Sequence, residues 1–345
     1  MRINNDGWHD RLSPTAASQR FKRYGIVGCS RTIDEVIQRI ELVSKTRSTV
    51  LITGETGTGK ELVARALHNR SAERDMPFVK VNCAAIPEPL LESELFGHVK
   101  GAFTNAIGTK KGKFSLANRG SIFLDEIGKM RGDLQAKLLR VLQEREIEPL
   151  GGERAEPVDV RVIAATNCDL RHLVNEGRFQ DDLFYRLHVI PIAVPPLRER
   201  REDIAMLAEY FTHKHATRSR KLIDTLEDDV VSRLQAHDWP GNVRELENTI
   251  ERAVVLTTGS SITADVITIE GTAGDRNHAI PSLNLQQNIE WVERETIRQA
   301  LQISSAKRHA ATLMGISPRA LSYYLAKYKF TDGGTAHRGG IPIRG

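Results

Sequence analysis

The chain has 345 residues, enough for two or three domains, and its hydrophobic content of 40% is typical of a globular protein. No apolar run approaches the roughly 18 residues of a membrane-spanning helix, and the polar N-terminus excludes a secretory signal, so we expect no membrane partner. Three scattered cysteines exclude a disulfide framework and a zinc site, which favours a cytoplasmic protein. The net charge is +5, and residues 281–345 carry nine Lys and Arg against four Asp and Glu. This distribution predicts a nucleic-acid-binding appendage on a neutral body.

Strand and helix patterns alternate over the first part of the chain. Residues 1–24 are polar and lack a long periodic segment, so we expect them to be mostly disordered. From residue 25 to residue 195, continuous apolar runs alternate with amphipathic segments of helical period. This alternation predicts an α/β fold in which helices cover both faces of a parallel sheet. The expected strands are 48–53, 77–83, 121–126, 158–167 and 188–194.

The pattern becomes purely helical after residue 195. Amphipathic segments at 203–211, 228–237 and 243–256 predict a small helical bundle. The polar stretch that follows contains glycine and is typical of a flexible linker. The expected segments are a helical bundle at 196–262, a linker at 263–287, an all-α unit at 288–330 and a disordered tail at 331–345.

The sequence GETGTGK at 54–60 matches the phosphate-binding pattern G-x-x-x-x-G-K. It follows an apolar strand and opens a helix, which is the context that the pattern needs. Backbone N–H groups of such a loop bind phosphate at the positive end of the helix, and Lys60 reaches the outer phosphates. The predicted nucleotide-binding residues here are Gly54, Glu55, Thr56, Gly57, Thr58, Gly59, Lys60 and Glu61.

The next expected strand but one ends in two carboxylates, Asp125 and Glu126. Ligands bind at this edge of open α/β sheets, so we expect Asp125 to hold Mg²⁺ and Glu126 to orient the attacking water as general base. Glu61 stands where a hydroxyl ligand for the metal is common, so the ion depends more on water and on Asp125. The alternative is a pair of solvated carboxylates at the start of a helix.

Residues 94–106, ELFGHVKGAFTNA, carry a second motif. This stretch resembles the ELFGH…GAFTGA signature of bacterial sigma-54-dependent activators, which are AAA+ ATPases that act on RNA polymerase. The resemblance covers about residues 26–330. It implies an AAA+ α/β subdomain at 25–195, a helical lid at 196–262, ATP and Mg²⁺ as cofactors, and sigma-54 RNA polymerase as partner. It also implies self-association, from dimer to hexameric ring.

Several roles follow from this resemblance. Asn82 in VNCAAIP matches the family's switch residue, which links the nucleotide state to the polymerase-contacting loop. Thr166 and Asn167, at the end of a strand, resemble the sensor of the terminal phosphate. Arg244 in WPGNVREL matches the second sensor, carried on the lid. Taken alone, each of these residues is equally an ordinary cap or surface residue.

The segment 177–187, GRFQDDLFYRL, resembles the family's arginine-finger segment GRFREDLYYRL. Arg186 keeps its position, and we assign it the finger that acts on the neighbouring subunit's site. The other family arginine is Gln180 here, which cannot supply positive charge, so we expect slower hydrolysis. The alternative for Arg186 is an ion pair with Asp182 at i,i+4 spacing.

The polymerase-contacting loop departs from the family at one position, where Asn105 replaces its second glycine. Asparagine is the residue that best tolerates a positive φ after glycine, so we expect the loop backbone to survive the change. Phe103 at the loop tip is otherwise read as an ordinary core residue. The residues expected to contact sigma-54 are Gly101, Ala102, Phe103, Thr104, Asn105 and Ala106.

Residues 306–328 predict a helix-turn-helix. Gly315 makes the turn, Ser317 caps the second helix and Pro318 fits its first turn. The unit resembles the Fis-like C-terminal domain of these activators; a simple two-helix hairpin is the alternative. The apolar residues of 289–301 predict a dimer contact. Candidate contacts to double-stranded DNA are Lys307, Arg308, Ser317, Arg319, Ser322, Tyr323 and Lys327.

Together these features predict a DNA-binding transcription activator that uses ATP hydrolysis in an oligomeric ring to remodel sigma-54 RNA polymerase. The first 24 residues are too few for a sensor domain, so we expect regulation by expression level or by a partner protein in trans. Two alternatives stay open. One is a DNA-bound AAA+ regulator that no longer engages sigma-54, and the other is an AAA+ remodeller of a different substrate.

Overall fold

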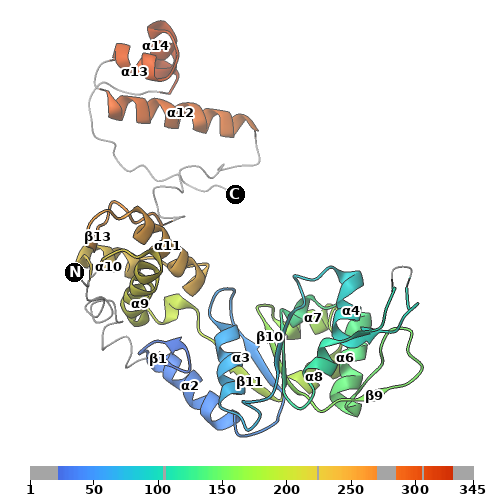
Figure 1. Cartoon of the computed structure of the whole chain (residues 1–345). Helices are drawn as coiled ribbons and strands as arrows, with labels where there is room; N and C mark the ends of the chain where they lie inside the picture. Colours follow the sequence, from blue (N-terminus) through green and yellow to red (C-terminus); the bar gives the residue numbers. More distant parts are fainter. Residues whose placement is uncertain (1–21, 104–105, 224, 270–284, 305–306, 329–345) are drawn as a thin grey trace, which may run out of the picture. The chain divides into compact units, whose positions relative to one another are not determined.

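The protein forms two compact units, Met1–Ile269 and Glu270–Gly345 (Figure 1). The structure, a computed structural model, describes residues 22–103, 106–223, 225–269, 285–304 and 307–328. Most of the two segments that we expected to be disordered lies outside these ranges. Within the first of them, however, β1 (Lys22–Arg23) pairs antiparallel with β2 (Ile26–Val27), so the ordered chain begins before residue 25.

A five-stranded parallel sheet forms the centre of the larger unit. The strand order is β11-β3-β10-β7-β4, and every neighbouring pair is parallel. The carboxyl ends of all five strands therefore lie at one edge of the sheet. The strands are β3 (Val50–Thr53), β4 (Phe78–Asn82), β7 (Ser121–Asp125), β10 (Arg161–Thr166) and β11 (Ile190–Ala193).

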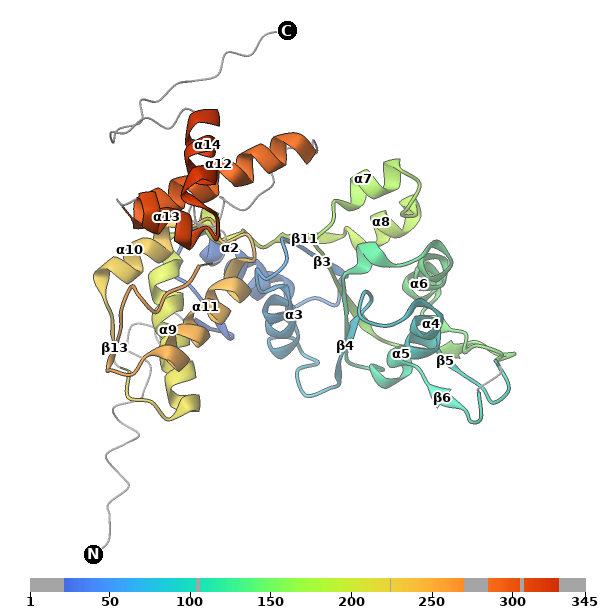
Figure 2. The same cartoon turned by 90° about the horizontal axis from the view of Figure 1, so that it is seen from above.

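Helices cover both faces of this sheet, as the alternating pattern predicted (Figure 2). Along β3, Val50 and Ile52 face one cluster of buried side chains while Leu51 faces the other, because successive side chains of a strand point to opposite faces. The first cluster includes α2 (Arg31–Val43) and α3 (Lys60–Asn69). The second includes α4 (Glu88–Phe96), α6 (Gly132–Glu144), α7 (Leu170–Asn175) and α8 (Asp181–Leu187).

Two small hairpins extend from the second face of the sheet. After α4, the chain forms β5 (Gly97–His98) and β6 (Lys110–Lys111), which pair antiparallel before the short helix α5 (Lys113–Leu116). After α6, β8 (Glu146–Ile147) pairs with β9 (Glu156–Pro157). The two hairpins touch, since Val99 N donates to Leu150 O at 3.0 Å.

A helical lid follows the last strand of the sheet. It contains η3 (Leu197–Glu199), α9 (Glu202–Ser219), α10 (Asp228–Ala236), α11 (Asn242–Leu256) and a two-stranded pair, β12 (Thr225–Leu226) and β13 (Ser261–Ile262). Its core surrounds the fully buried Trp239. Ile267 and Ile269 also belong to this core, so our prediction of a linker from residue 263 was wrong, and the lid extends to Ile269.

The smaller unit contains three helices: α12 (Leu285–Ile303), α13 (Lys307–Leu313) and α14 (Pro318–Lys327). The first begins three residues before the expected start at residue 288. Gly315 has a φ of 66°, and the Ser317 hydroxyl accepts a hydrogen bond from Ala320 N at 3.2 Å, as a turn and an N-cap require. None of the helices in the described residues is long and apolar enough to cross a membrane.

Candidate nucleotide site and partner-contacting loop

The phosphate-binding loop follows β3 directly, and α3 begins at Lys60. Gly57 has a φ of 81°, and a Cβ atom there would lie 2.2 Å from the carbonyl oxygen of Gly241. Glycine is therefore required at this position for both backbone conformation and space. The loop that results runs from the sheet edge to the N-terminus of α3, where backbone N–H groups and the helix dipole favour phosphate.

Lys60 is almost fully buried inside this loop. Its Nζ donates to the carbonyl oxygens of Gly54 at 2.8 Å and Glu55 at 3.1 Å. Burial lowers the pKa of the ammonium group, while the carboxylates of Glu126 and Asp125 oppose this shift. The lysine thus lies between the loop and the two carboxylates that end β7.

Asp125 and Glu126 lie at the carboxyl edge of the sheet. Asp125 Oδ1 accepts a hydrogen bond from Glu126 N at 3.0 Å. Glu126 has a φ of 56°, in the left-handed region, and its Oε2 is buried without a hydrogen-bond partner among the described residues. Backbone strain combined with an unsatisfied buried carboxylate is typical of a functional group rather than a structural one.

A pocket of about 530 Å³ joins these groups to the lid. Its polar end contains the phosphate-binding loop, the two carboxylates, Asn82 and Arg244. Its apolar end is formed by β2 and α9 and is suited to a flat base. The apolar and aromatic side chains at that end are Ile26, Val27, Leu207, Tyr210 and Phe211.

The two carboxylates fit a magnesium ion. Mg²⁺ is usually held by one or two carboxylates together with substrate phosphates and water. Asp125 and Glu126 supply such carboxylates, beside the loop that would bind the phosphates. Within the described ranges, no three His, Cys, Asp or Glu side chains gather into a metal site.

The predicted switch and sensor residues occupy different positions around the loop. Asn82 Oδ1 accepts hydrogen bonds from Ala84 N at 2.9 Å and Ala85 N at 3.0 Å, which holds the turn after β4. Asn167 Nδ2 donates to Thr56 Oγ1 at 3.0 Å. Thr166 is fully buried, and its hydroxyl accepts from Cys168 N instead of facing the loop. Both members of the predicted sensor pair therefore contact the phosphate-binding loop: Asn167 through its side chain, and Thr166 through its carbonyl oxygen, which accepts from Gly54 N at 3.3 Å.

Arg186 lies at the exposed end of α8 and outside the pocket of its own chain. It forms no hydrogen bond or ion pair with any residue in the described parts of the chain, so the ion pair with Asp182 that we considered is absent. Arg178, by contrast, pairs with Glu176 at 3.1 Å. Arg186 is thus an exposed cation with no partner in the described chain.

The loop at 97–106 folds back on itself. Gly101, with a φ of 86°, donates from its N to Ala106 O at 2.9 Å, and Ala106 N donates to Phe103 O at 2.9 Å. The Phe103 ring is 38% exposed and meets the ring of His98 edge-on at 4.9 Å. Thr104 and Asn105, both predicted contacts of sigma-54, lie outside the described residues. The described part of the loop presents an aromatic ring to solvent.

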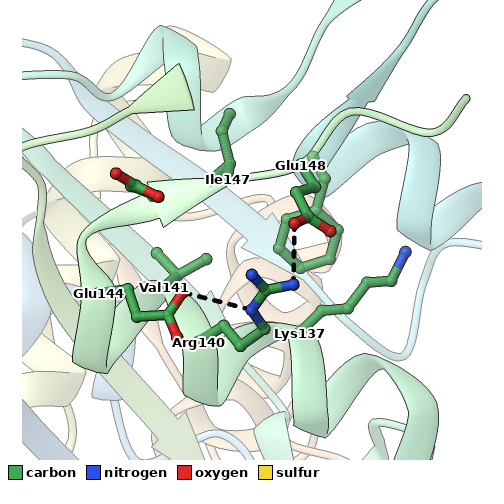
Figure 3. Close-up of a pocket in the computed structure, with 8 residues that line it drawn as sticks. Lys137, Arg140, Val141, Glu144, Ile147 and Glu148 are labelled. Atoms are coloured by element: carbon green, nitrogen blue, oxygen red, sulfur yellow. Dashed lines mark hydrogen bonds and ion pairs between the residues drawn. The ribbon is translucent and has the colours of Figure 1, made fainter. Parts of the chain in front are cut away.

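A second, shallow pocket of about 20 Å³ lies between α6 and β8 (Figure 3). Arg140 points between Glu144 and Glu148, with ion pairs of 3.3 and 2.9 Å. These charges neutralise one another, and the space accommodates about one water molecule. This pocket is therefore not a candidate nucleotide site.

Comparison with known proteins agrees with this geometry. Residues 26–193 match the family model described as the sigma-54 interaction domain, and residues 198–279 match the AAA+ ATPase lid domain. The transcriptional regulatory protein ZraR of Klebsiella oxytoca is 46% identical over 324 residues, which cover 92% of this chain and 72% of that protein. The chain belongs to the sigma-54 interaction family.

Other members of the family extend the comparison. The activator HyfR of Escherichia coli is 58% identical over 69% of this chain, and the regulatory protein AtoC of the same organism is 49% identical over 83%. The chain spans 35% and 64% of these two relatives, respectively. The crystal structure of NtrX from Brucella abortus in complex with ADP has a TM-score of 0.70 and 36% identity, and covers 90% of this chain and 70% of that one. The predicted family and the AAA+ fold are thereby confirmed.

The departure from the sigma-54 family at Gln180 has a structural explanation. Gln180 Nε2 donates to Gly132 O at 3.1 Å, and its backbone N donates to Gln135 Oε1 at 2.8 Å. The glutamine therefore joins the start of α8 to α6 and has a local role. Only Arg186 of the two family positions offers a guanidinium.

All seven candidate DNA contacts of this family member are exposed. Three of them also have a local role: Ser317 caps α14, the Ser322 hydroxyl donates to Pro318 O at 3.0 Å, and Lys327 Nζ pairs with Glu293 at 3.0 Å. Lys327 lies on the side of α14 that faces α12. A DNA phosphate would therefore compete with Glu293 for its ammonium group.

The predicted dimer face of α12 also divides. Ile297 is buried in the core of its own unit, and Leu301 packs against that core. Ile289 and Val292 are half exposed. Only the first part of the apolar stripe is therefore available to a second chain.

Sequence analysis missed three lid residues that reach the phosphate-binding loop. Arg198 pairs with Glu55, Arg200 donates to Thr58 O, and Asn242 donates to Thr56 O. The signal for the first two was the arginine-rich segment LRERR directly after the last expected strand. Asn242 lies in the WPGNVREL motif, two residues before the predicted sensor Arg244.

Proposed function

We propose that this chain activates transcription by coupling ATP hydrolysis, in an oligomeric ring, to the remodelling of sigma-54 RNA polymerase on DNA. The observation that carries the proposal is Glu126, an orphaned and strained carboxylate beside Asp125 and Lys60 in the nucleotide pocket. Family membership supplies the partner, since the matched domain is named for its interaction with sigma-54. NtrX, a structural neighbour, was crystallised with ATP, which supports this nucleotide.

The chemistry is phosphoryl transfer to water. Lys60 and the loop N–H groups would hold the phosphates, and Asp125 would hold Mg²⁺, whose charge would offset negative charge on the phosphates. Glu126 orients a water molecule and accepts its proton. The water oxygen then attacks the terminal phosphorus while the bond from that phosphorus to the bridging oxygen breaks. The unsatisfied Oε2 of Glu126 is free to make this contact.

Arg186 would complete the site of the adjacent subunit. An arginine that stabilises transition-state charge in phosphoryl transfer contributes about 10³–10⁵ in rate. The exposed position of Arg186 on α8 and its lack of a partner in the described chain support this role. We infer that the active protein is a ring, with a hexamer as the expected form.

Asn82 connects the pocket to the contacting loop. It lies beside Asp125 in the register of β4 and β7, and its side chain holds the turn that leads into α4. The contacting loop follows α4 directly. A change in the Asn82 hydrogen bonds during hydrolysis would therefore move the base of the loop that carries Phe103.

The C-terminal unit would hold the protein at a DNA site through Lys307, Arg308, Arg319 and Tyr323. These side chains are exposed on α13 and α14, in a basic segment of the chain. A site of this kind places the ATPase near its polymerase, and the expected location is the cytoplasm. Regulation by a protein acting in trans belongs to the same proposal.

Promoter opening with purified components tests the proposal. The chain, sigma-54 RNA polymerase, ATP and a sigma-54 promoter are mixed, and melted DNA is detected by permanganate reactivity. We expect Glu126→Gln to lower ATP hydrolysis by at least about 10²-fold and to abolish opening, because the general base is lost. Phe103→Ala should keep hydrolysis and lose opening.

Leu42→Ala is the control, because Leu42 is an exposed apolar side chain on α2, outside the pocket and the loop. This variant should retain both activities. ATP hydrolysis by the unchanged chain without promoter opening would contradict the sigma-54 role and favour a DNA-bound AAA+ regulator that no longer engages the polymerase.

A further inference from the structure

The lid contacts the phosphate-binding loop at four consecutive residues. Glu55 binds Arg198 and Asn242, and Thr56 O accepts from Asn242 Nδ2 at 3.1 Å. Gly57 O accepts from the backbone N of Arg244 at 3.3 Å, and Thr58 O accepts from Arg200 Nη2 at 3.1 Å. Residues 55–58 of the loop are thus all hydrogen-bonded to the lid. Of the lid residues that make these contacts, only Arg244 was predicted to bind nucleotide.

Glu55 and Arg198 form a bidentate ion pair. Arg198 Nη1 donates to one carboxylate oxygen of Glu55 at 2.8 Å, and Nη2 donates to the other at 2.6 Å. The hydrogen bond from Arg198, together with that from Asn242, lowers the pKa of Glu55 to about 2. The Glu55 side chain therefore faces the lid, although its backbone belongs to the phosphate-binding loop.

Asn242 is fully buried and adopts a φ of 54° at the start of α11. Its Oδ1 accepts from Leu197 N at 2.7 Å, and its Nδ2 donates to Glu55 Oε2 and Thr56 O, each at 3.1 Å. Arg200 is also buried at the same junction. Buried polar side chains of this kind have fixed orientations, because every change leaves a donor or acceptor unsatisfied.

The direction of these hydrogen bonds matters for phosphate binding. In a trans peptide, the C=O of one residue and the N–H of the next point in opposite directions. Donors on the lid that hold the carbonyl oxygens of Thr56, Gly57 and Thr58 therefore turn the following N–H groups away from the lid. Of these, Thr58 N donates to Glu55 O at 3.4 Å, which leaves the N–H groups of Gly57 and Gly59 for phosphate. These N–H groups belong to the part of the loop that lines the nucleotide pocket.

We propose that Glu55, Arg198 and Asn242 form a latch between the loop and the lid that orients the loop N–H groups for nucleotide phosphates. They are positioning residues, because they act through the loop backbone. The latch should affect the binding of ADP and ATP alike, because the loop N–H groups that it orients face phosphates common to both nucleotides. This inference rests on nucleotide binding and not on the polymerase partner.

Glu55→Gln gives the decisive measurement. Removing a negative charge beside a phosphate site should by electrostatics alone tighten the binding of an anionic nucleotide. The latch requires the opposite, because the charged, bidentate hydrogen bonds to Arg198 are lost. We expect the Kd of Mg-ADP, measured by calorimetry on the full chain, to rise about ten-fold, with kcat at saturating ATP changed less than about three-fold.

Arg198→Gln should weaken Mg-ADP binding to a similar extent. The matched control is Arg201→Gln, which removes an equal charge three residues after Arg198. The Arg201 side chain contacts Asp238 and Gln235 O inside the lid and does not reach the loop. This control should bind Mg-ADP within about two-fold of the unchanged protein. The double variant of Glu55 and Arg198 should be no weaker than either single variant, because both remove one interaction.

Asn242→Asp removes the donors to Thr56, Glu55 and Pro240 and adds a negative charge beside Glu55, so we expect a larger loss of affinity from it. Thermal melting without nucleotide shows whether each variant is folded, and Glu55→Gln and Arg198→Gln keep the test valid if the Asn242 variant is not. Equal or tighter Mg-ADP binding by Glu55→Gln would overturn the proposal, as would equal losses in Arg198→Gln and Arg201→Gln.

Discussion

Neighbouring residues of the nucleotide site have different environments that the sequence does not reveal. Glu126 is both strained in its backbone and unsatisfied in its side chain, while the adjacent Asp125 is hydrogen-bonded. Two neighbouring carboxylates thus have different environments, which suits one for metal binding and the other for water activation. Arg186 lacks any described partner in its own chain. Under the proposed function, Arg186 would complete the site of a second subunit.

Arg186→Ala should abolish ATP turnover, by about 10³-fold or more, while nucleotide binding is retained. Mixing subunits gives a sharper measurement. A ring that contains both Arg186→Ala and Glu126→Gln chains has some sites with an intact base and a neighbour's intact arginine. Hydrolysis should therefore reappear in the mixture, although each variant alone is inactive. No recovery on mixing would show that Arg186 does not act between subunits.

At the scale of elements, one buried arginine joins the sheet to a helix. Arg161 lies in β10, and its guanidinium donates to Val43 O at 3.0 Å and Ser44 O at 3.5 Å. These carbonyl oxygens lie at the C-terminal end of α2, where the last turn lacks intrahelical donors. Val43 O also accepts hydrogen bonds from Thr46 N at 3.1 Å and Thr46 Oγ1 at 3.0 Å. Burial lowers the pKa of Arg161, with Glu73 opposing the shift. The side chain therefore caps a helix from within the core.

Arg161→Met should lower the free energy of unfolding by about 2–4 kcal/mol, because the buried, charged hydrogen bonds from Arg161 to Val43 O and Ser44 O are lost. Urea unfolding followed by circular dichroism measures this change. Arg145→Met is a suitable control, since Arg145 also donates to a backbone oxygen, that of Val160, but is exposed. A loss of less than about 1 kcal/mol for both variants would contradict the capping role.

At the scale of the whole molecule, two units of different charge share one chain. The larger unit holds the nucleotide pocket and the contacting loop, and the smaller one carries the basic helix-turn-helix. If the smaller unit binds DNA as proposed, its tether would raise the local concentration of the ATPase at the target. ATP turnover and DNA binding should therefore be separable by mutation.

DNA binding should weaken steeply with salt, because phosphate contacts release counterions. Measured by fluorescence anisotropy, the logarithm of the binding constant should fall linearly with the logarithm of salt concentration. Arg308→Ala should reduce the slope by about one unit. Lys327→Ala should change it less, because Lys327 is already paired with Glu293. A salt-independent affinity would argue against DNA as the ligand.

Local patterns predicted the elements and much of the pocket. The apolar run before Gly54 and the G-x-x-x-x-G-K pattern placed β3 and the start of α3 at Lys60. Contacts between distant segments were not predictable in this way: Glu55 and Arg198 are 143 residues apart, and no periodicity links them. Ile267 and Ile269 were missed because the apolar run VITI at 266–269 is too short to show a helical or strand period. Their burial depends on the packing of the lid.

The approach of Gly57 to Gly241 also sets a limit on how this protein can vary. A methyl group at residue 57 would lie 2.2 Å from the carbonyl oxygen of Gly241, and one at residue 241 would lie 2.8 Å from the Cβ of Glu245. At residue 57 the collision is with backbone, so alanine there requires a shift of the lid. At residue 241 the collision is with the side chain of Glu245 in the next turn, so alanine there requires the start of α11 to move. Libraries that aim to retune the nucleotide preference should leave both positions fixed and diversify the apolar rim of the pocket.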